Sequence, residues 1–140
     1  MPYLQRVDRF IALFGAAVCL ILTPVLWRNV SAYQTTWPLP ALYFIELMAF
    51  GLVGAMVFLR DRPRKAAVAW AIGGSLTAFA VLGAWSVGFF YMPAALAFLV
   101  AGAGADIGHK EARARHVAIF FAGMAVQATL MLAAVRAMYP

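Results

Sequence analysis

The sequence predicts an all-α integral membrane protein, folded as a bundle of five transmembrane helices. Of its 140 residues, 66% are hydrophobic and 11% are charged, whereas soluble domains average about 45–50% apolar and about 25% charged residues. The stretch from Ala66 to Ala105 contains no Asp, Glu, Lys, Arg or His. One bilayer crossing needs about 20 apolar residues, so this stretch is too long for one span and long enough for two. We expect its turn within Gly83–Gly88, or just before Pro93.

The remaining spans are bounded by charges and prolines. The first follows a short basic tail that ends at Arg9, and its apolar run exceeds the roughly 7–15 residues of a signal peptide, so we expect it to be retained. Pro38 and Pro40 prevent a helix from running through the loop before the second span. A basic turn at 60–65 and a charged connector at 106–116 separate the later spans. The expected spans are about 10–27, 41–59, 66–84, 88–105 and 117–137.

The basic residues test the number of spans. With five spans, nine of the eleven lysines and arginines lie on the side of the N-terminus, and only Arg28 and Arg136 lie opposite. If Ala66–Ala105 crossed once, giving four spans, the division would be seven to four. Because basic residues concentrate in cytoplasmic loops, the bias favours five spans with a cytoplasmic N-terminus and an outside C-terminus, with four spans as the alternative.

The same charges indicate the partners. We expect a basic surface in contact with anionic lipid headgroups. Its members are Arg60, Arg62, Arg64, Lys65, Lys110, Arg113 and Arg115. Nucleic acid is not an expected partner, because no aromatic platform or basic domain accompanies the charges. The single cysteine, Cys19, excludes an internal disulfide and a cysteine-based metal site. High Ala and Arg content and short loops favour the bacterial inner membrane.

Small residues recur four positions apart in the spans, which predicts close helix packing in lipid and leaves faces that could seat another subunit or a second copy. These sets are Ala12 and Ala16; Gly51 and Ala55; Gly74 and Ala78; Ala97, Ala101 and Ala105; and Ala125, Thr129 and Ala133.

Glu46 is the one acid inside an apolar run. An ionisable residue in a span is costly and normally faces the bundle interior or a cavity with a partner. Glu46 lies about 7–8 Å below the outer boundary of the membrane, counted from Ala41 at the start of the span. It could bind a proton or cation, or it could pair with Arg28 or Arg136. Gln127, Ser75 and Thr77 could extend it into a polar path, or could simply form interhelical hydrogen bonds.

His109 and His116 are seven residues apart and would share a face if the connector were helical. They are the only candidate ligands for a metal or haem, and the neighbouring Lys and Arg residues disfavour a bound cation, so we expect neither metal nor cofactor. Asp106 and Glu111 are expected to balance charge on a solvated basic surface.

The sequence contains no HExxH, GxSxG or phosphate-binding loop. The leading interpretation is therefore a non-enzymatic membrane protein that acts by association, either as an accessory or structural subunit of a complex or as a homo-oligomer. The alternatives are a small transporter or channel that uses Glu46, and an intramembrane enzyme that acts on lipid headgroups through Asp106, His109, Glu111 and His116.

Overall fold

The computed structural model describes residues 2–32, 39–61, 63–84, 86–107 and 110–138. Within these ranges the chain forms five α-helices and one short 3-10 helix, and no strand. The elements are α1 (Pro2–Ser31), α2 (Leu39–Leu59), α3 (Lys65–Leu82), η1 (Gly88–Tyr91), α4 (Met92–Ala105) and α5 (Lys110–Met138). All five helices, with η1 counted as part of the fourth, are long and apolar enough to cross a membrane. The predicted all-α, five-helix fold is confirmed.

The helices extend beyond the apolar runs that predicted them. Helix α1 begins at Pro2 instead of near residue 10, and α5 begins at Lys110 instead of 117. The cause is that Arg, Lys, Glu, Gln and Ala all favour helix, so the charged flanks continue the helices into the region outside the apolar spans. The connector between α4 and α5 is correspondingly short.

The uncharged stretch from Ala66 to Ala105 folds as two helices joined by a tight turn, as predicted. The Gly83 N–H donates to the Phe79 carbonyl, which ends α3, and the Gly88 N–H donates back to the Gly83 carbonyl, both at 2.9 Å. A Cβ on Gly88 would lie 2.6 Å from the Phe79 oxygen, so the turn requires glycine there. Pro93 stands in the first turn of α4, where its missing N–H removes no helical bond.

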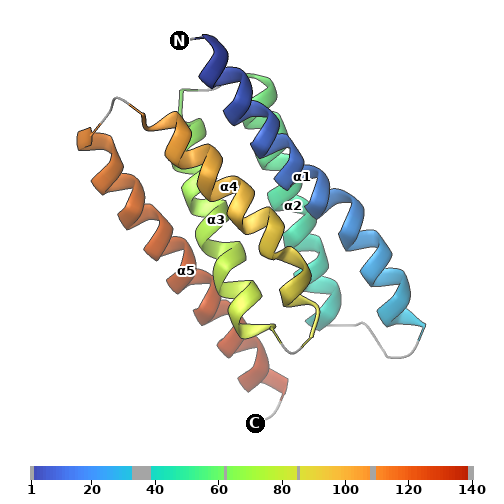
Figure 1. The fold of residues 1–140 in the computed structure, drawn as a ribbon. Helices are drawn as coiled ribbons and strands as arrows, with labels where there is room; N and C mark the ends of the chain where they lie inside the picture. The colour runs from blue at the N-terminus through green and yellow to red at the C-terminus, as the bar shows by residue number, and fades with distance from the viewer. Residues whose placement is uncertain (1, 33–38, 62, 85, 108–109, 139–140) are drawn as a thin grey trace.

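Four helices form a ring and the fifth lies outside it (Figure 1). Around the ring, α1 packs along α2 and along α4, α4 packs along α3, and α2 closes the ring through a smaller contact with α3. Helix α5 packs along the outer side of α3. The N-terminus of α1 and the C-terminus of α5 lie at opposite ends of the bundle (Figure 1).

Glycines allow the helices of the ring to approach closely around Phe98, which is fully buried. Cβ atoms added to Gly15 of α1 and Gly54 of α2 would lie 3.2 Å and 2.6 Å from the Phe98 ring. The aromatic ring of Phe98 therefore fills the space between α1, α2 and α4. Van der Waals contact of this kind matters in a bilayer, because lipid provides little hydrophobic drive for helices to associate.

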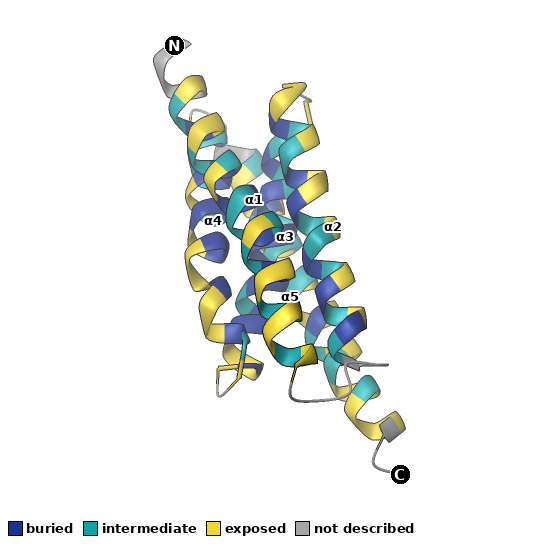
Figure 2. Cartoon of the chain, turned by 90° about the vertical axis from the view of Figure 1, so that its right-hand side faces the viewer, coloured by how far each residue is buried: buried dark blue, intermediate teal, exposed yellow. Residues whose placement is uncertain are grey.

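The small-residue sets predicted to pack do so in four of the five helices. Ala12, Ala16, Gly51, Gly74, Ala78, Ala97 and Ala101 are buried, and Ala55 and Ala105 are half-buried, whereas the α5 set is exposed. Only 6% of the residues in the apolar stretch of α5 are buried, compared with 50% in α3. Figure 2 shows buried residues turned toward the bundle interior and exposed residues along the outer helix surfaces. Helix α5 thus keeps most of its apolar surface open.

Candidate functional site

Two groups of buried polar side chains stand out from the apolar bundle. The first, the Glu46 pair, joins α2 to α5 within the spans. The second, the Asp106 cluster, joins α3, the α4–α5 connector and α5 at the basic end, defined as the end of the bundle that holds the N-terminus and the turn at 60–64.

The Glu46 pair is a direct hydrogen bond between two residues predicted to share a polar path. Gln127 Nε2 donates to Glu46 Oε2 at 2.9 Å, and Gln127 is only 2% exposed while Glu46 is partly exposed. The suggested pairing of Glu46 with Arg28 or Arg136 is wrong: among the described residues, the close contacts between acidic and basic side chains are Lys65–Asp61 and His116–Asp106. An amide both donates and accepts, so Gln127 can satisfy Glu46 in either protonation state.

Tyr43 lies one helical turn from Glu46, on the same side of α2. Its hydroxyl is buried and has no hydrogen-bond partner among the residues that the structure describes. Its ring meets Phe79 of α3 edge to face, with centroids 5.9 Å apart. Tyr43 was not among the predicted site residues, although a tyrosine three positions before Glu46, the one acid inside an apolar run, is a detectable signal.

Ser75 and Thr77 do not complete a continuous path. Ser75 Oγ donates to the Gly123 carbonyl of α5 at 3.4 Å, one turn from Gln127, so Ser75 strengthens the α3–α5 contact. Thr77 Oγ1 donates to the Gly73 carbonyl within its own helix at 2.7 Å. Of the four predicted residues, the structure joins Glu46 to Gln127, places Ser75 on an adjoining contact and leaves Thr77 apart.

In the Asp106 cluster, both carboxylate oxygens of Asp106 have hydrogen-bond partners. Asp106 Oδ2 accepts from Trp70 Nε1 at 2.9 Å, and Oδ1 lies 2.8 Å from His116 Nδ1. Asp106 is 2% exposed and His116 is 5% exposed. The expectation that Asp106 balances charge on a solvated surface is therefore wrong. An indole N–H is a donor only and needs an acceptor when it is buried. The need of Trp70 for such an acceptor is a signal in the sequence that the prediction for Asp106 did not use.

The weak metal candidates find no support in the described residues. His109 lies outside them and the Glu111 side chain is not described. The Nδ1 atom of His116 faces Asp106. No group of three or more His, Cys, Asp or Glu side chains within the described ranges could hold a metal ion.

The predicted headgroup surface is partly described. Arg60, Arg64, Arg113 and Arg115 are exposed at the basic end, whereas Arg62 and the side chain of Lys110 lie outside the described residues. The Lys65 side chain is 19% exposed and contacts Asp61 at 2.6 Å. Arg9 Nη2 donates to the Leu59 carbonyl at 3.4 Å, which places it against the C-terminus of α2.

Comparison with known proteins adds no assignment: no family model, curated protein or solved structure matches the chain.

Proposed function

We propose that this chain is a multi-pass membrane protein that acts by association, as a structural or accessory subunit or as a homo-oligomer, and that the open face of α5 is its contact surface. The observation that carries the proposal is the position of α5, which packs along α3 and leaves its other sides open. Ala125, Thr129 and Ala133 lie on that open face, four residues apart.

The bundle uses the same packing device internally. A Cβ on Gly74 of α3 would overlap the Phe120 carbonyl oxygen of α5, and one on Gly123 of α5 would lie 2.7 Å from the Ala71 oxygen. Small residues thus let the α3 and α5 backbones touch. Because lipid tails solvate apolar side chains well, small residues on an outer face favour another helix more than they favour lipid.

We also propose that the basic end faces the cytoplasm of a bacterial cell and that the C-terminus lies outside. In the sequence, nine of the eleven basic residues lie in the N-terminal tail, the turn at 60–65 and the connector at 106–116, and the positive-inside bias assigns such basic segments to the cytoplasm. The exposed arginines of the basic end would contact anionic headgroups of the inner leaflet.

Photo-crosslinking in native membranes tests association. Benzoylphenylalanine replaces Thr129, on the open face of α5, and in a matched control it replaces Phe14, which is 58% exposed on α1. We expect adducts with one protein, either a second copy or a fixed partner identified by mass spectrometry, at position 129 and not at position 14. Adducts with lipid alone, or equal protein adducts at both positions, would refute the proposed contact surface.

A second candidate function is proton or cation transfer at the Glu46 pair. The observation in its favour is that a partly exposed carboxyl group in a span is held by Gln127 beside the unpartnered hydroxyl of Tyr43. Such groups mark ion or proton pathways in membrane proteins.

Proteoliposome flux of protons or monovalent cations, read with a pH dye or an ion-sensitive dye, tests this candidate. Glu46→Gln should abolish flux while the protein stays folded. Thr77→Val should leave flux unchanged, because the Thr77 hydroxyl bonds only within α3. Absence of flux in the wild-type protein would eliminate the candidate.

We do not propose an enzymatic role. Asp106 and His116 meet as a headgroup enzyme would need, but among the described residues no hydroxyl or thiol forms a hydrogen bond with His116. The cluster is accounted for by its contacts among α3, α5 and the connector.

A further inference from the structure

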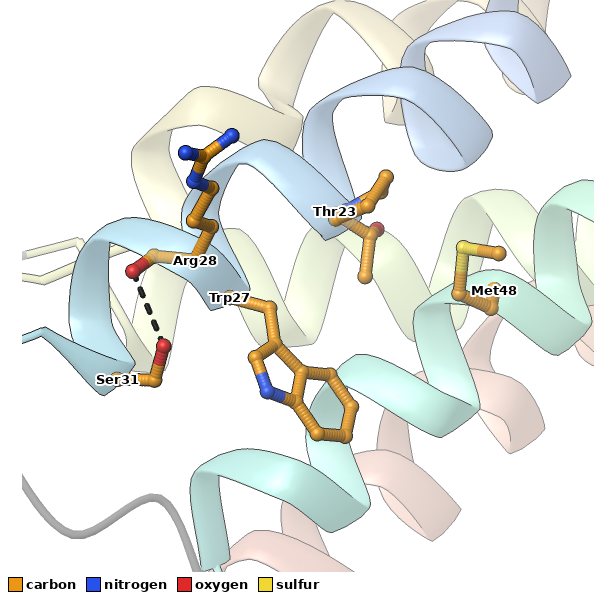
Figure 3. A pocket seen from close by; sticks show the side chains of 6 residues that line it. Thr23, Trp27, Arg28, Ser31 and Met48 are labelled. Carbon is orange, nitrogen blue, oxygen red and sulfur yellow. Dashed lines mark hydrogen bonds between the residues drawn. The ribbon is translucent and has the colours of Figure 1, made fainter.

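An open cleft of about 470 Å³ lies between α1 and α2 (Figure 3), and the α1 residues that line it belong to the C-terminal part of that helix, away from the basic end. Its lining is mostly apolar. Six residues form it: Thr23, Pro24, Trp27, Arg28, Ser31 and Met48. None of them belongs to the Glu46 pair or the Asp106 cluster.

The deeper part of the cleft is apolar because its polar atoms are used elsewhere. The Thr23 hydroxyl donates to the Cys19 carbonyl and lies 2.8 Å from the Tyr91 hydroxyl. Thr23 therefore offers its methyl group to the cleft. The Trp27 ring is stacked on Phe44, with centroids 5.6 Å apart, which fixes one wall. Met48 forms the opposite wall with a flexible, apolar side chain.

The other end of the cleft is polar. Arg28 and Ser31 are exposed, and Ser31 Oγ donates to the Arg28 carbonyl at 3.0 Å. Arg28 takes part in neither of the close contacts between acidic and basic side chains found among the described residues. At a rise of 1.5 Å per residue, Ser31 lies about 12 Å along the axis from Thr23. Along the axis of α1, the lining of the cleft thus changes from apolar side chains to Arg28 and Ser31.

We propose that this cleft binds one anionic phospholipid of the outer leaflet, with an acyl chain along Thr23, Trp27 and Met48 and the phosphate on Arg28. Charge complementarity supports this occupant: a guanidinium matches phosphate oxygens in a two-pronged arrangement. Trp27 lies beside Arg28, where tryptophan is enriched at membrane interfaces. This inference rests on the membrane location proposed above and is independent of association through α5.

The headgroup should decide which lipid binds. An acyl chain has equally apolar surroundings in the bilayer and in the cleft. The apolar wall therefore selects for the shape of the chain and contributes little to the preference for one lipid over another. Arg28 supplies the preference for negative charge. One basic residue near an anionic surface supports an enrichment of about fivefold.

The test uses the full-length protein in vesicles of equal parts phosphatidylglycerol and phosphatidylethanolamine, each in turn carrying a photoreactive acyl chain. Adducts are mapped to peptides by mass spectrometry. We expect phosphatidylglycerol to label the segments around residues 23–31 and 48 about fivefold more than phosphatidylethanolamine does. R28Q should remove this preference. R136Q is the matched control, because Arg136 is the other arginine near this end of the bundle, and it should keep the preference.

A second variant keeps the test informative if R28Q misfolds. M48W fills the apolar part of the cleft and should reduce labelling there by both lipids, while labelling of exposed Phe14 on α1 is unchanged. Equal labelling by the two lipids in the wild type, or the same loss in R28Q and R136Q, would overturn the proposal. So would the absence of lipid labelling around residues 23–31 and 48, because the cleft would then be covered by another occupant, such as a second copy of the chain. Each of these readouts is separate from crosslinking at position 129, so failure here and failure of association are distinguishable.

Discussion

At the residue scale, polar side chains are tolerated in this apolar bundle because neighbouring helices supply their partners. Asp106 receives the Trp70 N–H and faces His116 Nδ1, and Gln127 bonds to Glu46. A buried polar group without a partner loses its hydration and gains nothing in return. These residues therefore connect specific helices to one another.

Replacing Asp106 with alanine should destabilise the protein. The variant leaves the partly buried Trp70 N–H and the buried His116 ring without their acceptor, and such losses cost up to about 1–3 kcal/mol each. The thermal unfolding midpoint in mild detergent, followed by circular dichroism, measures the effect. Asp106→Asn keeps an oxygen acceptor for Trp70 and should lose less. An unchanged midpoint in Asp106→Ala would contradict the assigned role.

Asp61 has an unusual backbone conformation, with φ of 45° in the turn between α2 and α3. Asp and Asn tolerate this left-handed region, whereas a β-branched residue is strained in it. Asp61→Val should therefore cost about 1–2 kcal/mol more than Asp61→Asn, measured as the difference in unfolding midpoints. Equal midpoints for the two variants would show that the turn relaxes at no cost.

The charge of Asp61 should contribute little. The hydrogen bond from Lys65, together with its positive charge, lowers the pKa of Asp61 below its usual value. A lowered folded pKa gives stability that is present above the unfolded pKa, near 4, and is lost as the pH falls through the folded value. Because the Asp61 side chain is 65% exposed, the pair is screened, so Asp61→Asn at neutral pH should change stability by less than about 1 kcal/mol.

At the element scale, the contact between α3 and α5 depends on glycine. An added Cβ at Gly74 would overlap the Phe120 carbonyl oxygen, which belongs to the α5 backbone. At the neighbouring Gly73 the nearest atom is Leu99 Cδ2, at 2.8 Å, which can move by a side-chain rotation. Gly74 therefore tolerates an added side chain less well than Gly73 does.

Gly74→Ala should separate α5 from α3 and cost about 1–3 kcal/mol, the usual range for overpacking, whereas Gly73→Ala should cost less. Unfolding midpoints of the two variants measure the difference. Gly74→Ala should also weaken the Gln127–Glu46 hydrogen bond, because Gln127 lies on the helix that is displaced. A Gly73→Ala variant less stable than Gly74→Ala would contradict this account of the contact.

The helices were predictable from the sequence, but the contacts between particular helices were not. The lengths of the apolar runs and the positions of charges indicated five helices and the turn at Gly83–Gly88, because each property is local in the sequence. The pairing of Glu46 with Gln127, and of Asp106 with Trp70, depends on which helices become neighbours. That choice depends on the shapes of whole helix faces, such as Gly74 against Phe120, and the spacing of small residues alone does not specify it.

At the scale of the whole molecule, the arrangement predicts which segments can be reached from each side of the membrane. Ser31 is exposed at one end of the bundle, and Pro63 and Ile107 are exposed at the basic end. The native Cys19 is fully buried, so the wild-type protein should not react with a thiol reagent and serves as the negative control. None of the three positions carries a charge, so cysteine at each leaves the distribution of basic residues intact.

A membrane-impermeant maleimide applied to intact cells should label Ser31→Cys and should label Pro63→Cys and Ile107→Cys only after the membrane is opened. The reason is that basic loops are retained in the cytoplasm, and nine of the eleven basic residues belong to the N-terminal tail, the turn at 60–65 and the connector at 106–116. The opposite pattern at all three positions would invert the proposed orientation. Labelling of Ile107→Cys together with Ser31→Cys would instead place Ile107 on the same side as Ser31, as the four-span alternative with a single crossing by Ala66–Ala105 requires, and would contradict the bundle.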